Sequence, residues 1–445
     1  MGRSARWGCL LLALLLGCYE FRGSTDWVPF DTARLMVTNS PKTYRIHSVL
    51  KTDGDILDFG TGANGEPRFT DRGIAYLPPG AAETTLDRGV IRGIMVGLWV
   101  FRISCPFIYV ERNGQWRRVG EPLGGALTAG LARWETVCLG RGPGPLRVMI
   151  RNVNSEIQYL DAVKALAVDT KLLAIAKGID GVAVADRVRA PAKAAADGVD
   201  MRAAIADADG RMWSSRYAGG STRDEVILEF DETPSSPALV LTAGGTLLES
   251  DLVGDILRMR GDSLVDWYRR IDTNPAESLV LLHWAAREEI HLLKVEVRTS
   301  DGGWATAGFV PSGGPEVLPR RAIPLKLPAS PASPLTLRLR PPKGMWAFDE
   351  VGLASIVDEK AATRALEPLS GLPAELASAD GRFLEMRPAS AAIVIEYPAL
   401  KEDETAFLRI RGYYKVLIEP AGDAAVLRRI ETVDGEAVRY AHRRQ

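Results

Sequence analysis

Ser263 lies in Gly261-Asp262-Ser263-Leu264, a pattern that can carry the nucleophile of an ester-cleaving reaction. A serine nucleophile needs a histidine base, and that base needs an acid to orient it. No Asp-x-x-His pair follows near the carboxyl end, and the pattern lies mid-chain in a segment of helical spacing. We therefore interpret Asp262 and Ser263 as solvated residues of a helix or turn.

His283 and His291 flank Arg287-Glu288-Glu289, an arrangement that suggests zinc binding at first sight. Zinc ligands on one helical face stand at positions i and i+4. These histidines are eight residues apart, and Arg287 between them would repel a cation. We expect both histidines to pack at a helix edge, and we expect no metal site and no cofactor.

Two further segments match binding motifs only in part. Gly60 to Gly65 fits G-x-G-x-x-G, but Glu66 to Phe69 leads back toward a strand, whereas a dinucleotide site requires a helix there. Asp207-Ala208-Asp209-Gly210 lacks the distal glutamate of a calcium loop. We expect a flexible loop in the first case and a hairpin turn in the second.

Tryptophan side chains can stack on sugar rings, although most of them fill cores or staple hairpins. Trp116, Trp213 and Trp304 each come just after a turn, which makes them the candidate ligand contacts. Trp346 lies beside a strand that recurs in the chain, and we expect it in a core.

The amino-terminal eighteen residues are typical of a bacterial export signal. Arg3 and Arg6 precede the apolar run Leu10 to Leu16, which is too short to span a membrane core of about 30 Å. Leu15-Leu16-Gly17-Cys18 resembles the lipobox of bacterial lipoproteins, which implies that Cys18 takes a diacylglycerol anchor. Leu16 stands where Ala or Ser is usual, and ordinary signal cleavage is the alternative.

Tyr19 stands where an Asp would retain such a lipoprotein in the inner membrane, so the resemblance implies an outer-membrane lipoprotein on its periplasmic or surface side. A soluble periplasmic or secreted protein is the alternative. No later segment has the roughly 18 uninterrupted apolar residues of a membrane span. The formal net charge is −1, which gives no electrostatic argument for a nucleic-acid partner.

Cys105 and Cys138 are the cysteines that remain once Cys9 has left with the signal and Cys18 carries the lipid. In an oxidising periplasm they can form a disulfide. Alternatively, they are two buried thiols that pack as small apolar side chains.

The length of 445 residues predicts about three domains. Turns at Asp53-Gly54 and Asn113-Gly114 between alternating apolar and polar residues predict hairpins. We expect a mainly β fold, with a small N-terminal β-barrel followed by jelly-roll-like β-sandwich modules. The expected segments are a signal peptide at 1–18, a barrel-like domain at 19–100, a β-rich domain at 101–182, an Ala/Pro-rich linker at 183–199, a β-sandwich at 200–358 and a C-terminal β module at 359–445.

A short helical insertion is expected near 250–290, and we expect it to pack across an open end or edge of a sandwich. Asn274 is typical of an N-cap, Pro275 suits the first helical position and Glu277 is an acid three residues after the cap. The apolar residues that then follow helical spacing are Leu279, Leu282, Ala286 and Ile290.

Three segments recur in order, which indicates an internal duplication. The repeated pairs are Tyr159 to Asp169 with Ala347 to Asp358, Ala208 to Arg211 with Ala379 to Arg382, and Val226 to Phe230 with Ile393 to Tyr397. Two copies are too few for a solenoid, so we expect two related β-sandwich modules.

Ser104-Cys-Pro-Phe-Ile-Tyr109, Gly120-Glu-Pro-Leu-Gly-Gly-Ala126 and Tyr159-Leu-Asp-Ala-Val163 resemble shared motifs of an uncharacterised family of exported bacterial proteins, often lipoproteins. The segment Asp224 to Val357 also resembles galactose-binding-like jelly rolls, which bind sugars in some proteins and only pack in others. Neither resemblance implies catalytic residues.

The sequence therefore predicts a non-catalytic, lipid-anchored envelope protein that acts as a binding or scaffold component. Its expected partners are membrane lipid through the anchor, and envelope proteins or glycans. A carbohydrate-binding β-sandwich protein is the first alternative. A glycoside hydrolase or other envelope hydrolase is the second, and it would need two carboxylates about 5 to 9.5 Å apart across a cleft.

Overall fold

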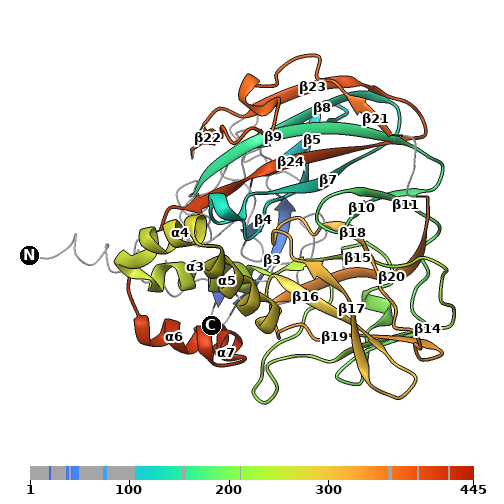
Figure 1. Ribbon diagram of the computed structural model, residues 1–445, viewed down its shortest axis with the longest axis vertical. Coiled ribbons are helices and arrows are strands. Elements are labelled where there is room, and N and C mark those ends of the chain that lie inside the picture. Colours follow the sequence, from blue (N-terminus) through green and yellow to red (C-terminus); the bar gives the residue numbers. More distant parts are fainter. Residues whose placement is uncertain are drawn as a thin grey trace, which may run out of the picture. The chain divides into compact units, whose positions relative to one another are not determined.

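The structure, a computed structural model, describes two units of the chain, Met1–Val100 and Phe101–Gln445 (Figure 1). The described residues are four short strands before residue 100, and 106–444 apart from 153–155, 211, 359–362, 388–389 and 419–420. In the first unit an antiparallel sheet has the order β1 (Glu20–Phe21), β2 (Val37–Asn39), β3 (Lys42–Val49) and β4 (Ile74–Leu77). Cys18, Gly60 to Gly65 and Cys105 lie outside the described residues.

The second unit begins with a β-sandwich, which we call the first sandwich. One of its sheets has the order β23 (Ile393–Leu400), β8 (Gly144–Arg151), β5 (Phe107–Arg112) and β6 (Gln115–Gly120). The other has the order β21 (Thr363–Leu366), β9 (Glu156–Asp169), β24 (Glu404–Val416) and β7 (Arg133–Arg141), with β22 (Leu384–Met386) also paired to β9. The predicted turn between β5 and β6 is confirmed, since Asn113 and Gly114 have φ of 53° and 73°.

A second sandwich lies below the first in Figure 1. Its six-stranded sheet has the order β13 (Val199–Asp200), β12 (Lys193–Ala196), β14 (Val226–Phe230), β19 (Leu335–Leu339), β16 (Leu292–Arg298) and β17 (Trp304–Pro311). Facing it, a closed barrel has the order β10 (Leu173–Lys177), β11 (Val182–Ala185), β20 (Trp346–Asp358), β15 (Pro237–Gly245) and β18 (Arg320–Pro324). The predicted mainly β fold is confirmed.

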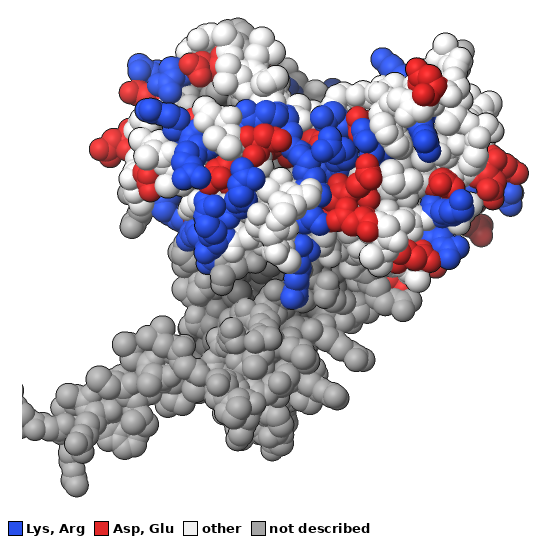
Figure 2. All heavy atoms as spheres, turned by 90° about the horizontal axis from the view of Figure 1, so that it is seen from below, with Lys and Arg blue, Asp and Glu red and all other residues white. Residues whose placement is uncertain are grey.

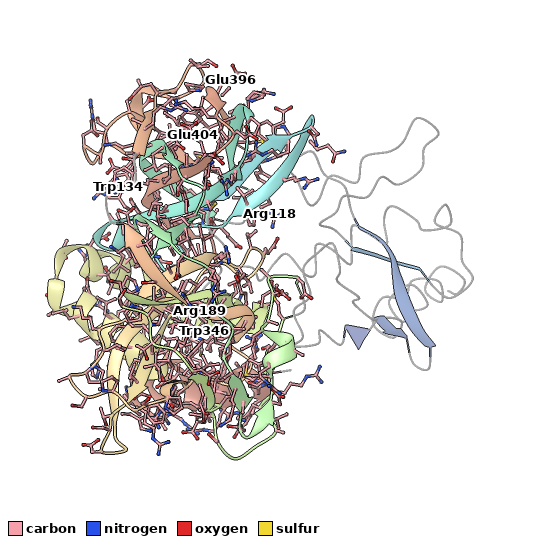
Figure 3. All side chains as sticks on the ribbon, turned by 90° about the vertical axis from the view of Figure 1, so that its right-hand side faces the viewer. Arg118, Trp134, Arg189, Trp346, Glu396 and Glu404 are labelled. Carbon is pink, nitrogen blue, oxygen red and sulfur yellow. The ribbon has the colours of Figure 1, made fainter. Side chains whose placement is uncertain are left out.

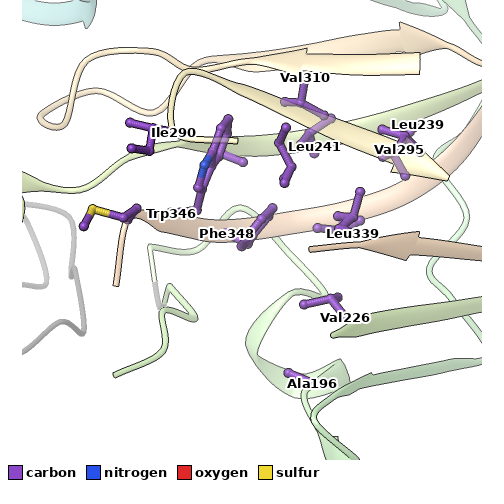
Figure 4. Close-up of a cluster of buried hydrophobic side chains, with 14 of the residues drawn as sticks. Ala196, Val226, Leu239, Leu241, Ile290, Val295, Val310, Leu339, Trp346 and Phe348 are labelled. Carbon is purple, nitrogen blue, oxygen red and sulfur yellow. The ribbon is translucent and has the colours of Figure 1, made fainter. Parts of the chain in front are cut away.

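Apolar side chains from both layers fill the core of the second sandwich. Trp346 and Phe348 of β20 stack with ring centroids 6.2 Å apart, and Leu241 and Val310 lie beside them (Figure 4). Trp346 is 1% exposed, as expected for a core residue, and its Nε1 donates a hydrogen bond to the Glu289 carbonyl at 2.7 Å.

The second sandwich is inserted into the first between β9 and β21. Consequently β24, near the end of the chain, pairs with β9 from Glu404 opposite Asp169 to Val416 opposite Glu156. Residues 359–445 do not form the separate module that we expected, because β21 to β24 complete the sheets of the first sandwich. The expected linker 183–199 is not a linker, because it contains β12 and most of β11. Its alanines lie in strands that pair with β10 and β14, and composition alone does not reveal this pairing.

The duplicated segments are interleaved rather than consecutive. Asp161 of β9 accepts a hydrogen bond from the backbone N–H of Gly381 at 2.8 Å, and Asp349 of β20 accepts one from Gly210 at 2.9 Å. Both glycines have positive φ, 79° and 84°. Each sandwich therefore holds one aspartate strand and one Ala-Asp-Gly-Arg loop. Neither loop is the hairpin turn that we expected at Asp209-Gly210, because neither joins two adjacent strands.

The helical insertion is confirmed between β15 and β16 as α3 (Leu247–Met259), α4 (Leu264–Thr273) and α5 (Pro275–Glu288). The Asn274 side chain caps α5 by accepting a hydrogen bond from Ala276 N, and Pro275 is its first residue. After β24 the chain ends in α6 (Ala424–Thr432) and α7 (Glu436–Arg443). Single 3₁₀ turns lie at Ala129–Leu131, Arg202–Ala204, Gly261–Ser263 and Ala374–Leu376.

Helix α3 joins the two cores. Leu252 and Ile256 pack into the core of the second sandwich, whereas Val253 and Leu257 pack into that of the first. The helical insertion therefore spans the junction of the two sandwiches.

Helix α5 packs through a face other than the one its apolar spacing indicated. Leu279 and Leu282 are 65% and 51% exposed, while Leu281 and Ala285 face inward. Four consecutive apolar residues occupy 279–282, so apolar spacing alone does not identify the packed side of this helix.

Candidate functional site

A cavity of about 610 Å³ lies among α3, α4, α5 and the ends of both sandwiches. Its size is within the range of ligand sites, roughly 300 to 1,000 Å³. The wall is mostly apolar and includes Leu131, Val253, Leu257, Trp267, Leu281 and Trp284. A chamber of this kind favours a ligand with a long apolar part.

Five charged side chains lie in this apolar wall, and three of them are arginines, Arg133, Arg260 and Arg270. The other two are Glu277 and Glu431. Nη2 of Arg133 donates a hydrogen bond to the Gly124 carbonyl. Arg270 is about half exposed, and its Nε lies 3.6 Å from the Glu277 carboxylate, which is longer than a hydrogen bond. The guanidinium of Arg270 therefore has donors that an anionic group in the cavity can use.

Arg260 is held between an aromatic ring and a carboxylate. Its Cζ lies 4.0 Å from the centroid of the Trp267 ring, and its Nη2 donates to Glu431 Oε1 at 2.8 Å. Burial lowers the pKa of this guanidinium, and the Glu431 charge opposes that effect. Trp284 is fixed by a hydrogen bond from Nε1 to the Ile430 carbonyl at 3.1 Å.

His291 contributes the imidazole of the cavity wall. Its Nδ1 lies 2.7 Å from Oε1 of Glu249, a nearly buried residue in the first turn of α3. The backbone N–H of Ser312 bonds to the His291 carbonyl at 2.8 Å, so these two residues are opposite each other at the ends of β16 and β17. The Ser312 hydroxyl itself donates to the Gly313 carbonyl at 3.2 Å.

The segment Gly120 to Ala126, which carries part of the family resemblance, reaches this cavity. Gly124 and Gly125 line it, and a Cβ at Gly125 would lie 3.8 Å from the His291 ring. Glu121 points instead to the second sandwich, where its Oε2 accepts a hydrogen bond from the Glu316 backbone N–H at 3.0 Å. A Cβ at Gly314 would lie 2.0 Å from Cδ of Glu121, so this close approach requires glycine.

Arg118 connects the other resemblance motif to the second sandwich. Its guanidinium lies 3.8 Å from the centroid of the Phe107 ring and 5.8 Å from that of Tyr109, and it forms a buried ion pair with Glu316. Figure 3 shows Arg118 at the level where the two sandwiches meet. Burial lowers the pKa of Arg118, but the charges of Glu316, Tyr109 and Glu121 and the hydrogen bond to Glu316 together raise it more, so the net shift is upward. These motif residues hold the two sandwiches together.

A smaller cavity of about 300 Å³ contains Cys138, between β6, β7 and the segment Val317 to Arg321. Burial raises the pKa of the Cys138 thiol, which makes it a poor nucleophile. Because Cys105 lies outside the described residues, its pairing with Cys138 stays a prediction.

The structure places the three predicted ligand-contact tryptophans apart. Trp116 lies on β6 with Arg147 Cζ 5.5 Å from its ring centroid, and Trp304 lies on β17 with Arg338 Cζ at 4.3 Å. Trp213 packs against Phe348 of the second core. None of them lines either cavity, and sugar binding by these residues stays a prediction.

The remaining motif that could carry chemistry, Gly261 to Leu264, lies at a turn. Gly261–Ser263 is a 3₁₀ turn before α4, as interpreted, and the Ser263 hydroxyl donates to the Arg260 carbonyl at 2.6 Å. Among the described residues, no group of three or more His, Cys, Asp or Glu side chains is placed to hold a metal ion. Within the same residues, no helix is long and apolar enough to cross a bilayer.

Sequence reasoning missed the cavity residues Trp267, Trp284 and Arg260. The available signal was the helical insertion itself, which brings two tryptophans and several arginines into one short segment. Their convergence depends on how α3, α4 and α5 fold back on one another across the junction.

Fold and site define a mainly β protein in which two sandwiches share a helix-covered apolar cavity. Comparisons with protein-family models, with curated proteins and with solved structures found no match to this chain. The functional argument therefore rests on the cavity.

Proposed function

We propose that this protein is a non-catalytic binding component of the bacterial envelope, anchored through Cys18, and that its cavity holds a long-chain carboxylic acid. The observation that carries the proposal is the combination, within about 610 Å³, of an apolar wall and three arginine side chains, which outnumber the two glutamates Glu277 and Glu431. An alkyl chain would lie against Leu257, Leu281 and the two tryptophan rings, and the carboxylate would accept hydrogen bonds from Arg270.

The apolar wall can supply enough affinity for such a ligand. Each methylene removed from water contributes about 0.8 kcal/mol. About ten buried methylenes would contribute roughly 8 kcal/mol, which corresponds to a dissociation constant on the order of 1 μM. The ligand loses freedom of motion on binding, which lowers the affinity. Charge-assisted hydrogen bonds to a guanidinium raise the affinity.

Direct titration tests the proposal. Trp267 and Trp284 line the cavity, so their fluorescence reports on its occupancy. The full-length Cys18→Ser chain is titrated with hexadecanoate and with butanoate, which has the same carboxylate and almost no chain. Saturable binding of hexadecanoate near micromolar concentrations, without binding of butanoate, is expected. Absence of saturable hexadecanoate binding would refute the proposal.

A further inference from the structure

We infer that α5 and the adjoining α6 and α7 form a surface that docks on a bilayer containing anionic lipid, with the cavity mouth toward the lipid. The inference rests on the function proposed above and adds the source from which the ligand enters. It follows from exposed apolar side chains, from their position at the cavity and from the charge of the neighbouring helices.

Most of the exposed side chains of α5 are apolar, with His283 as an exposed polar one. Leu279, Val280 and Leu282 are 65%, 66% and 51% exposed, although the same helix already packs Leu281 and Trp284 inward. A helix that is apolar outside as well as inside leaves surface that water solvates poorly. Side chains of this kind insert into the boundary between lipid headgroups and acyl chains.

The exposed residues also belong to the cavity. Val280 and Leu282 line it while remaining more than half exposed, so the cavity reaches the surface beside them. An alkyl chain that leaves the cavity there meets apolar side chains before it meets water. This continuity favours a lipid bilayer as the partner that contacts the outer face of α5. The ligand can then move between bilayer and cavity without full hydration of its alkyl chain.

The neighbouring helices carry an excess of positive charge. Helix α5 adjoins α6 through hydrogen bonds from Trp284 to the Ile430 carbonyl and from Arg287 to the Glu431 carbonyl. Residues 424–444 contain five arginines and three acidic residues. The basic residues are Arg428, Arg429, Arg439, Arg443 and Arg444, and the acidic ones are Glu431, Asp434 and Glu436. Figure 2, viewed from below the orientation of Figure 1, shows basic side chains gathered toward the left and centre of that face, with acidic side chains among them.

One of these acids is shared by several arginines. Arg429, Arg439 and Arg443 all converge on the buried Glu436, with N–O distances of 3.2, 3.0 and 2.6 Å. A single carboxylate therefore balances only part of their charge. The remaining positive charge favours phosphatidylglycerol or other anionic headgroups over neutral ones.

Vesicle cosedimentation of the full-length Cys18→Ser chain tests the inference, since this variant cannot take the lipid anchor. We expect binding to vesicles of equal parts phosphatidylglycerol and phosphatidylcholine, and weaker binding to phosphatidylcholine alone. Adding Leu279→Glu should weaken vesicle binding at least about tenfold, because it places a charge where an apolar side chain inserts. The matched control is Val199→Glu on β13, where the parent side chain is 70% exposed, and it should bind like the parent.

Two results would overturn the inference. One is equal vesicle binding by the Leu279→Glu and Val199→Glu variants. The other is no vesicle binding by the parent. If Leu279→Glu then abolishes self-association in sedimentation, the apolar face of α5 binds a second copy of the chain and not a bilayer. Leu279 does not line the cavity, so its variant should still bind hexadecanoate in solution. Loss of docking with retained hexadecanoate binding is thus distinct from failure of the proposed function.

Discussion

Glu249 Oε1 lies 2.7 Å from His291 Nδ1, and the imidazole, but not the carboxylate, lines the main cavity. Glu249 is also near the start of α3, where its backbone N–H donates to the capping hydroxyl of Thr246 at 3.3 Å. The contact therefore links the cavity wall at the end of β16 to the helix that joins the two cores.

Replacement of His291 should destabilise the protein. His291→Ala removes this close contact with the nearly buried Glu249 carboxylate, and we expect the free energy of unfolding to fall by about 1 kcal/mol. Urea unfolding at neutral pH measures this change. In the double variant with Glu249→Gln the combined loss should be smaller than the sum of the two single losses, and strictly additive losses would contradict the interaction.

Asp349 should make stability depend on pH. Burial raises the pKa of Asp349 to about 6, with help from the Asp209 and Glu350 charges, while the hydrogen bond from Gly210 N–H acts in the opposite direction. The folded protein then retains a proton that the unfolded chain releases above about pH 4. Raising the pH from about 4 to about 6 should therefore lower the free energy of unfolding, by at most about 3 kcal/mol.

Paired variants separate this effect from other titrations. Asp349→Asn keeps an acceptor for Gly210 N–H, and it should remove this part of the pH dependence. The equivalent Asp161 contacts Arg411, so Asp161→Asn should instead lower stability at pH 7 by leaving that guanidinium without its partner. An unchanged pH profile in Asp349→Asn would contradict the assignment.

Much of the local structure was predictable because it depends on neighbouring residues. Asn274 and Pro275 begin α5, and Asn113-Gly114 forms the turn between β5 and β6, since caps and turns are determined within a few residues. The repeated segments were also recognisable. Which segments contact each other was not predictable. Asp161 binds Gly381, and the whole second sandwich is inserted between β9 and β21, so the two residues are far apart in the sequence.

The site was less predictable than the fold. Leu281 faces the cavity and Leu279 faces outward, although both are leucines of one helix, and only the packing of α5 distinguishes them. Likewise, the Arg260 guanidinium lies over the Trp267 ring because a 3₁₀ turn separates α3 from α4. Proximity of this kind depends on tertiary structure that no local pattern encodes.

Charge reversal at Arg270 should weaken ligand binding. Arg270→Glu places a carboxylate beside the anionic head of the proposed ligand, and we expect at least about a tenfold increase in the dissociation constant for hexadecanoate. Arg269→Glu is the control, because Arg269 is the preceding residue of α4, is exposed and does not line the cavity. Fluorescence titration should give the parent value for that control. Equal weakening in both variants would indicate a general charge effect rather than contact at Arg270.

Lipidation of Cys18 remains a prediction, and membrane fractionation tests it. The parent should stay with membranes through an alkaline carbonate wash, because acyl chains hold it. The Cys18→Ser variant should be released by that wash even where the α5 surface docks on lipid. If both proteins are retained equally, Cys18 is not the anchor.

The central claim, that the cavity is the ligand site, is tested most directly by filling it. Ala285 of α5 is nearly buried and lines the cavity, whereas Leu279 of the same helix is exposed and does not. The measurement is hexadecanoate affinity for Ala285→Trp and Leu279→Trp, each with a thermal unfolding midpoint to confirm folding. The account predicts at least about a tenfold loss for Ala285→Trp and a change within about twofold for Leu279→Trp, since only the former occupies ligand volume. Parent-like affinity in a folded Ala285→Trp variant would contradict it.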